Sequence, residues 1–218
     1  MTLERTLTLV KICGITNLDD ALAAVDAGAD ALGFNFYARS PRYISPANAC
    51  EITDQLPASV LKVGVFVNEQ LQSLLTIASD ANLTAVQLHG DESPDYCSRL
   101  KQTFVIKAFG AQDDLDLSAY AVDAIMLDTK DDLLRGGTGR VFDWSIAQRA
   151  NSRSANSSQP KLFLAGGLSP ENVAEAIATV RPYAVDACSS LELSPGKKNH
   201  TRMRAFVNAV RNVRLDAE

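Results

Sequence analysis

Short apolar runs alternate along this chain with stretches in which apolar residues recur at helical spacing. The runs are rich in Val, Ile, Leu, Phe and Ala, and most of them end at a polar or glycine-containing segment, which is typical of strands buried on both faces. This pattern predicts eight strands, at residues 8–13, 29–36, 60–67, 84–89, 104–109, 123–128, 161–167 and 184–190.

The stretches between the strands predict helices with recognisable ends. Asn17 is placed to cap the first of them, and Gly28 lies just past its end. In residues 169–182, Ser169 is a candidate N-cap and Pro170 a candidate first helical residue. Strands that alternate with helices in this way predict a parallel sheet.

Every connection between strands is long enough for a crossover helix. Eight strand–helix units predict an α/β fold of the (β/α)8 type, a TIM barrel. We expect a single domain over residues 1–218, with residues 1–6 as an N-terminal tail. An open, doubly wound sheet is the alternative, but it normally has GxGxxG after its first strand, and CGITN at residues 13–17 does not match.

Composition narrows the classes of function. The chain has 218 residues, of which 46% are hydrophobic and 22% charged, and its net charge of -5 does not indicate a nucleic-acid surface or an anionic membrane partner. No signal-peptide pattern is expected, and no apolar run reaches the ~18 residues of a membrane span. The cysteines form no CxxC pair, which favours reduced thiols in a cytoplasmic protein over a disulfide framework or a zinc site; they are Cys13, Cys50, Cys97 and Cys188.

The candidate chemistry lies where the predicted strands end, because active sites of (β/α)8 barrels gather at the C-terminal ends of the strands. Polar residues or glycines follow strands one, two, four, six, seven and eight. These residues are Cys13, Arg42, His89, Asp128, Gly166, Gly167, Ser189 and Ser190.

Cys13 and Asp128 are the candidates for catalysis. A lone cysteine is most often a small buried hydrophobe, and a lone aspartate at a strand end often caps a loop. At a polar barrel mouth, however, a thiolate of lowered pKa can act as a base, and a carboxyl group across the mouth can act as an acid. Two such groups on opposite sides of one substrate are what a proton-shuffling isomerisation needs.

The other candidates suit an anionic substrate. Arg42 can bind a carboxylate through its planar fork, although a surface arginine beside a turn fits equally well. His89 either faces the substrate or is a structural histidine. Gly166–Gly167 and Ser189–Ser190 lie on the seventh and eighth loops, where such barrels usually bind phosphate, although a tight turn also explains the glycines.

Two further loops are polar. GGTGR at residues 136–140 lacks the order of a nucleotide P-loop and is expected to form a flap over the site. PGKKNH at residues 195–200 is expected to be a solvated loop, with His200 as a structural residue near the start of the last helix.

Several motifs occur together and in a fixed order: KICGIT, SPRY, QLHGDE, LDT followed by GGTGRVFDW, LAGGLSPENV and SSLELSPGKK. Together they resemble the phosphoribosylanthranilate isomerases, and the resemblance runs from about Lys11 to the last helix. It implies a barrel enzyme of tryptophan biosynthesis. The implied reaction is the Amadori rearrangement of N-(5-phosphoribosyl)anthranilate to 1-(2-carboxyphenylamino)-1-deoxyribulose 5-phosphate, with no metal and no organic cofactor.

The resemblance also implies roles for single residues. Cys13 would be the general base and Asp128 the general acid, while Arg42 would hold the anthranilate carboxylate. The glycine and serine pairs would bind the phosphate. The expected partner is a small phosphorylated substrate, with no nucleic acid and no membrane, and the protein is expected to be a cytoplasmic monomer or homodimer.

Two positions depart from the family pattern. The family usually has DVSSGVE where this chain has DACSSLE, and we expect Leu191 to take the place of the glycine. Either this loop makes an ordinary right-handed turn from Ser190 with the leucine in the core, which we favour, or phosphate binding is weakened. Asn199 stands where the family tends to have aspartate, a change expected to be peripheral.

Two alternatives to the isomerase stay open. One is another phosphosugar isomerase of the same fold, although the related enzymes of histidine biosynthesis use paired aspartates and Cys13 argues against them. The other is a catalytically inactive barrel that serves as a binding protein, which the departure at Leu191 would favour.

Overall fold

The structure is a computed structural model that describes residues 8–100, 103–112, 117–129, 142–153 and 160–214. The predicted flap at residues 136–140 and the predicted tail at residues 1–6 lie outside the described residues.

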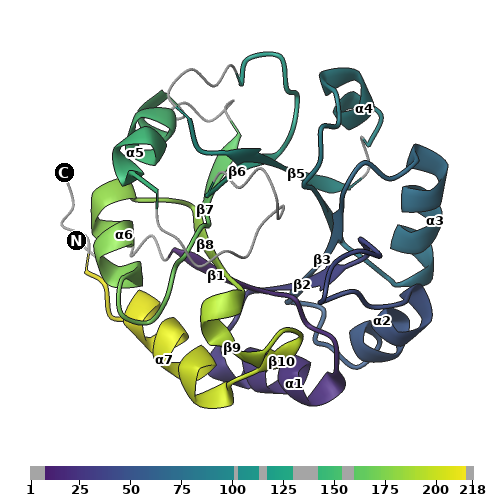
Figure 1. The fold of residues 1–218 in the computed structure, drawn as a ribbon, viewed down its shortest axis with the longest axis horizontal. Coiled ribbons are helices and arrows are strands. Elements are labelled where there is room, and N and C mark those ends of the chain that lie inside the picture. The colour runs from purple at the N-terminus through teal and green to yellow at the C-terminus, as the bar shows by residue number, and fades with distance from the viewer. Residues whose placement is uncertain (1–7, 101–102, 113–116, 130–141, 154–159, 215–218) are drawn as a thin grey trace.

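Eight parallel strands form a closed barrel in chain order, with the first strand paired to the last (Figure 1). Each predicted strand is confirmed, and closure of the sheet excludes the doubly wound alternative. The strands are β1 (Leu9–Cys13), β2 (Ala31–Asn35), β3 (Leu61–Phe66), β4 (Ala85–Leu88), β5 (Phe104–Gly110), β6 (Ala124–Asp128), β7 (Lys161–Leu164) and β8 (Ala184–Ala187).

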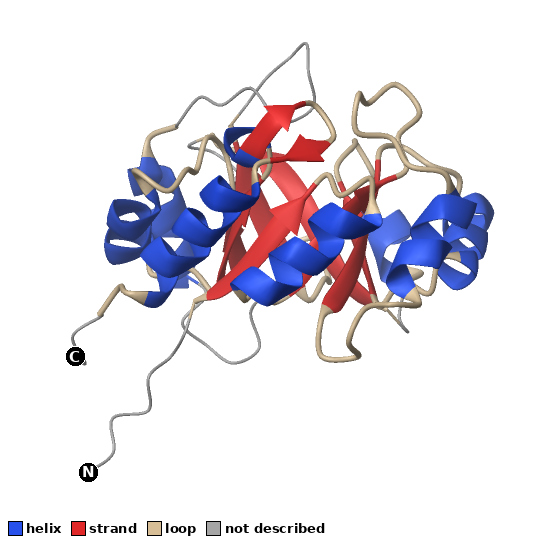
Figure 2. Ribbon diagram, turned by 90° about the horizontal axis from the view of Figure 1, so that it is seen from below, coloured by secondary structure: helices blue, strands red, loops and turns tan. Residues whose placement is uncertain are grey.

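Helices surround the barrel, as Figure 2 shows from the side. Asn17 caps the first helix, its side chain accepting a hydrogen bond from the Asp20 N–H, and Gly28 ends it with a left-handed φ of 97°. The helices are α1 (Leu18–Ala27), α2 (Pro46–Thr53), α3 (Leu71–Asp80), α4 (Pro94–Ser98), α5 (Trp144–Arg153), α6 (Val173–Val180) and α7 (His200–Arg211).

The predicted start of the sixth helix was wrong. Helix α6 begins at Val173, and Ser169 and Pro170 belong to a turn that precedes it. The Asn172 side chain accepts the Ser169 N–H at 2.8 Å and donates to Gly167 O at 3.0 Å. These bonds hold the chain in a turn at the place where a serine cap would have opened the helix.

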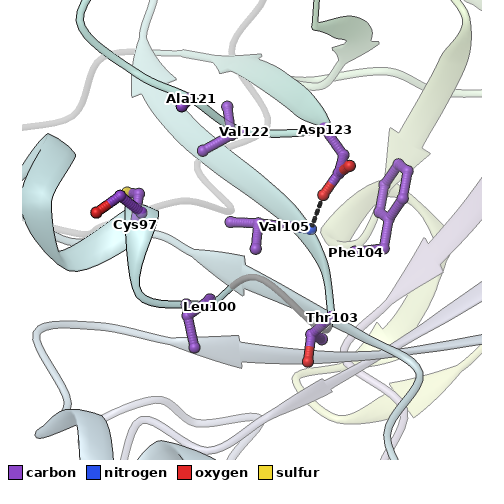
Figure 3. Close-up of a pocket in the computed structure, with 9 residues that line it drawn as sticks. Cys97, Leu100, Thr103, Phe104, Val105, Ala121, Val122 and Asp123 are labelled. Carbon is purple, nitrogen blue, oxygen red and sulfur yellow. Dashed lines mark hydrogen bonds between the residues drawn. The ribbon is translucent and has the colours of Figure 1, made fainter.

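The connection between β5 and β6 departs from the regular strand–helix alternation, because its described residues, 111–112 and 117–123, contain no helix. A hollow of about 860 Å³ lies beside it, between α4 and the starts of the two strands (Figure 3). One of its polar groups is already engaged, since Asp123 Oδ2 accepts the Val105 N–H at 2.8 Å. The hollow lies at the opposite end of the barrel from the strand ends that carry the candidate chemistry.

Strand alternation divides the core into two layers. One set of side chains, such as Ile12, Val86 and Leu127, packs between strands and helices. The other set, such as Ile106 and Met126, fills the barrel interior. On each strand, the residues that alternate with this second set at a spacing of two therefore point into the barrel, including those at its mouth.

The segment after β8 is folded, so the prediction of a solvated loop was wrong in part: Pro195 and Lys197 are exposed, but Lys197–Lys198 form a strand and Lys198 is buried. A 3-10 turn, η1 (Ser189–Leu191), leads into a hairpin of β9 (Glu192–Ser194) and β10 (Lys197–Lys198). Lys198 is buried, and its ammonium is paired: Nζ lies 3.0 Å from Glu192 Oε1, while the backbone N–H of the same residue donates to Asp20 at 2.8 Å. His200 Nε2 lies 2.7 Å from the same aspartate, so the prediction of a structural histidine is confirmed.

Candidate active site

Alternation along the strands brings four titratable side chains to the barrel mouth. Ala85, Ala124 and Ala184 lie in the interior layer of β4, β6 and β8. Counting by two along these strands places His89, Asp128 and Cys188 on the inner side. The same count on β1, from the inward Leu9, places Cys13 there.

Cys13 ends β1 in a close-packed niche with 9% of its surface exposed. A Cβ added to Gly33 on β2 would lie only 2.7 Å from the Cys13 sulfur, so a residue without a side chain makes this niche possible. A hydrogen bond from the Cys188 thiol, together with the positive charge of Lys11, outweighs burial and lowers the pKa of Cys13 to about 7. The same interaction raises the pKa of Cys188.

A buried ion pair lies directly beneath Cys13. Lys11 is fully buried, and its Nζ lies 2.7 Å from Asp186 Oδ1. Burial alone would lower the pKa of Lys11, but Asp186 and Cys13 outweigh it and raise the pKa, so the ammonium stays charged. The sequence reasoning missed both residues, although each precedes a mouth cysteine by two positions and alternation alone would have placed it inward.

Asp128 ends β6 with 9% of its surface exposed. Burial raises the pKa of its carboxyl group to about 6, against the opposing effect of the Thr129 N–H, which donates to Oδ1 at 2.7 Å. Gly166 makes room for this arrangement. A Cβ there would lie 2.5 Å from Thr129 Oγ1 and 3.2 Å from Asp128 Oδ1, and its φ of +83° also favours glycine.

His89 approaches Asp128 from β4. Its Nε2 lies 3.7 Å from Asp128 Oδ2, and its Nδ1 lies 2.8 Å from the amide nitrogen of Gln87. His89 therefore belongs to the same polar cluster as Asp128.

A second buried ion pair holds the loop that carries His89. Lys107 Nζ lies 3.0 Å from Glu92 Oε2 and 2.7 Å from Gly90 O. Glu92 in turn accepts the N–H groups of Gly90 and Asn68. These bonds cross from β5 to the loops after β3 and β4, so the QLHGDE segment is fixed by buried polar contacts.

Arg42 lies at the mouth but is already paired. Its Nε lies 2.9 Å and 3.1 Å from the two oxygens of Glu192, and its Nη2 lies 2.8 Å from one of them. Lys198 contacts the same carboxylate. A Cβ on Gly14 would lie 2.8 Å from Arg42 Cδ, so the arginine passes directly over the residue that follows Cys13. Glu192 and Lys198 were missed because the hairpin that brings them here has no strong sequence signal.

The two predicted phosphate loops lie side by side. Gly166 and Gly167 both have positive φ, at 83° and 67°, and follow β7. The Ser190 hydroxyl after β8 donates to Leu168 O, which joins the two loops. Arg202 Nε donates to Ser190 O at 2.7 Å and holds the second loop against α7.

The expectation that Leu191 replaces a family glycine was wrong in register. Read position by position, DACSSLE against DVSSGVE places the glycine at Ser190 and a family serine at Cys188. Among the described residues, neither Ser190 nor Leu191 has positive φ. Leu191 is fully buried in the core, as in the alternative that we favoured, and it therefore does not obstruct the loop. Asn199 caps α7 through the Arg202 N–H, a role that aspartate fills equally well.

The described residues contain no group of three His, Cys, Asp or Glu side chains placed to hold a metal ion. Within the same residues, no helix is both long and apolar enough to cross a bilayer.

Comparison with known proteins agrees with this geometry. The family of N-(5'-phosphoribosyl)anthranilate (PRA) isomerases matches residues 10–209. The N-(5'-phosphoribosyl)anthranilate isomerase of Thermotoga neapolitana is 49% identical over 208 residues, which cover 94% of this chain and 98% of the relative.

Two solved structures are also similar. A phosphoribosylanthranilate isomerase in complex with reduced 1-(o-carboxyphenylamino)-1-deoxyribulose 5-phosphate superimposes with a TM-score of 0.81 at 43% identity, over 94% of this chain and 99% of the other. A structure of monomers generated from the dimeric phosphoribosylanthranilate isomerase of Thermotoga maritima also has a TM-score of 0.81, at 42% identity and the same coverage. The chain therefore belongs to the phosphoribosylanthranilate isomerase family.

Proposed function

We propose that Cys13 and Asp128 are the base and the acid with which this isomerase of tryptophan biosynthesis rearranges N-(5-phosphoribosyl)anthranilate. The observation that carries the assignment is that two groups face one mouth with pKa values moved toward neutrality, to about 7 for Cys13 and about 6 for Asp128. Groups with pKa values near the working pH transfer protons most efficiently.

The reaction then needs two proton transfers. The Asp128 carboxyl group protonates the ribose ring oxygen, and the ring opens to a protonated Schiff base of the anthranilate nitrogen. The Cys13 thiolate removes the proton from C2′, which gives an enolamine, and tautomerisation gives the 2-keto product. No hydride is transferred and no bond to phosphorus breaks, so this route requires neither a nicotinamide nor a magnesium ion.

Arg42 can still meet a substrate carboxylate while it is held by Glu192. The carboxylate of Glu192 takes the side edge of the guanidinium, Nε and Nη2, whereas the end edge of a guanidinium offers a second pair of donors on Nη1 and Nη2. Glu192 would thereby orient the arginine toward the anthranilate ring. His89, beside Asp128, would contact the sugar.

Replacing Arg42 with alanine is expected to raise KM about 10–100-fold, the equivalent of one charge-assisted hydrogen-bonded contact, and to lower kcat much less. Lysine should not restore KM, because an ammonium lacks the planar fork. Arg39→Ala removes an exposed positive charge from the same loop and is the matched control, with KM unchanged. A collapse of kcat at normal KM in Arg42→Ala would contradict the binding role.

The phosphate would bind to backbone N–H groups of the adjoining loops at Gly166–Gly167 and Ser189–Ser190. Replacing Gly166 with alanine tests how closely this loop is coupled to the acid. The left-handed φ should cost about 1–2 kcal/mol of the free energy of unfolding. The new methyl group would also displace Thr129 and Asp128, and a displacement of this kind should lower kcat about 10–100-fold.

Gly28→Ala separates the two effects of that change. Gly28 also has a left-handed φ, of +97°, but its added Cβ would meet nothing closer than 3.4 Å and it lies at the end of α1. The control should lose similar stability in urea denaturation while keeping its kcat. Full activity in Gly166→Ala would show that Asp128 does not depend on this close approach.

The activity itself is tested by following anthranilate fluorescence with freshly made substrate and purified protein. If the protein is the isomerase, the fluorescence intensity of the substrate falls as it is converted, without added metal or cofactor. No change with this substrate, but turnover of another aminated phosphosugar, would favour the other barrel isomerase. No turnover with either would favour the inactive binding protein.

The protein would act on a small phosphorylated substrate in the cytoplasm as a single barrel domain. Its assembly is a monomer or a homodimer, and the dimeric state of the similar Thermotoga maritima enzyme supports the second.

A further inference from the structure

We propose that Cys13 and Cys188 are an oxidisable thiol pair that closes into a disulfide when the protein meets a peroxide. The pair results from closure of the barrel, which places β1 beside β8. Ile12 and Ala187 are partners in this parallel ladder, so the two cysteines follow at the same level of adjacent strands. Neighbouring strands lie about 4.8 Å apart, within the range of about 4.4–6.8 Å between the Cα atoms of a disulfide.

The two sulfur atoms are held against glycines at this junction. A Cβ on Gly14 would lie 2.9 Å from the Cys188 sulfur, and a Cβ on Gly33 would lie 2.7 Å from the Cys13 sulfur. Both side chains point to the inner side of the barrel, and each thiol shifts the pKa of the other, downward for Cys13 and upward for Cys188. The two cysteines therefore follow paired residues on adjacent strands and face the same inner space.

The positive charge of Lys11 favours the Cys13 thiolate that the first step of the oxidation requires. Cys188 has mixed surroundings, because its sulfur lies 3.8 Å from both Lys198 Nζ and Glu192 Oε1, and the neighbouring Cys13 raises its pKa. Burial raises the pKa of each of the other two thiols. The Cys50 sulfur lies 3.7 Å from the Asp54 carboxylate, and Cys97 is the buried residue of α4. Oxidation should therefore select the pair at the mouth.

The oxidation proceeds in two balanced steps. The Cys13 thiolate attacks one oxygen of hydrogen peroxide, which breaks the O–O bond and gives a Cys13 sulfenic acid and hydroxide. The Cys188 thiolate then attacks the sulfenic sulfur, forms the S–S bond and releases a second hydroxide. The protons lost from the two thiols convert both hydroxides to water, and the two sulfurs have supplied the two electrons.

The disulfide would switch the enzyme off reversibly. It removes the thiolate proposed as the base, so the loss of activity rests on the proposed function, whereas formation of the bond does not. Cys188 would also protect the enzyme, because a sulfenic acid without a neighbouring thiol proceeds to the irreversible sulfinic acid.

The experiment treats the intact protein with hydrogen peroxide at neutral pH and measures activity, free thiols and mass. We expect free thiols to fall from four to two, the mass to fall by two hydrogens, and peptide mapping to join Cys13 to Cys188. Activity should fall with the same time course, and dithiothreitol should restore both. A joined peptide without loss of activity would confirm the pair and contradict Cys13 as the base.

Two sets of variants make the test specific. Cys188→Ser and Cys188→Ala, each compared with its own untreated sample, should lose activity in peroxide without recovery by dithiothreitol, and Cys13 should gain two oxygens. Cys50→Ser should behave like the unmodified protein. Retention of four free thiols, or a sulfinic acid at Cys13 without a disulfide when Cys188 is present, would overturn the proposal.

Discussion

Asp128→Asn is expected to lower kcat by about 10²–10⁴-fold with little change in KM, because the amide cannot donate the proton that opens the ribose ring. The change keeps the shape of the side chain and an oxygen that can accept the Thr129 N–H. Unfolding by urea should therefore be close to that of the unmodified protein, and kcat from anthranilate fluorescence is the measurement.

Asp123→Asn is the matched control for that variant. Asp123 immediately precedes the same strand, but it lies at the opposite end of the barrel, where its carboxylate accepts the Val105 N–H. Its replacement should affect stability and leave kcat unchanged. If Asp128→Asn kept near-normal kcat, the acid would have to be another group, and His89 would be the first candidate because it faces the same mouth.

Cys13→Ser is expected to lower kcat by at least about 10²–10⁴-fold, because a serine hydroxyl stays protonated at neutral pH and cannot remove the C2′ proton. Serine fits the niche against Gly33, so the protein should remain folded. The measurement is again kcat, with circular dichroism as the check on the fold.

Cys97→Ser controls for the loss of a buried thiol. Cys97 is 2% exposed and lies on the buried side of α4, so serine should cost stability there without changing kcat. Near-normal turnover in Cys13→Ser would remove this residue from the chemistry and leave the Cys13–Cys188 contact without a catalytic role.

The barrel and most of the mouth could be predicted from the sequence because they depend on local patterns. Apolar runs marked all eight strands, and the first residues after those runs include Cys13, His89 and Asp128. The absence of a helix from the described residues between β5 and β6 could not be predicted, because Leu117, Tyr120 and Val122 pack against the core without helical geometry. Length alone had suggested a helix there.

The contacts that tune the site could not be predicted in the same way. Lys11 and Asp186 are 175 positions apart, and the Arg42–Glu192 pair joins residues separated by 150. Each pair forms only because the barrel closes or because the hairpin after β8 folds back over the mouth. A buried lysine also contradicts the usual expectation for charged residues, and only its partners explain it.

The dependence of kcat/KM on pH tests the central claim most directly. Cys13 acts only as a thiolate, so its contribution is gained as pH rises through about 7, and Asp128 acts only when protonated, so its contribution is lost as pH rises through about 6. We therefore predict a bell with its maximum between these values. In Asp128→Asn the residual activity should rise through about pH 7 to a plateau, with no fall on the alkaline side. An alkaline fall that persists in that variant would contradict the assignment of Asp128 as the acid.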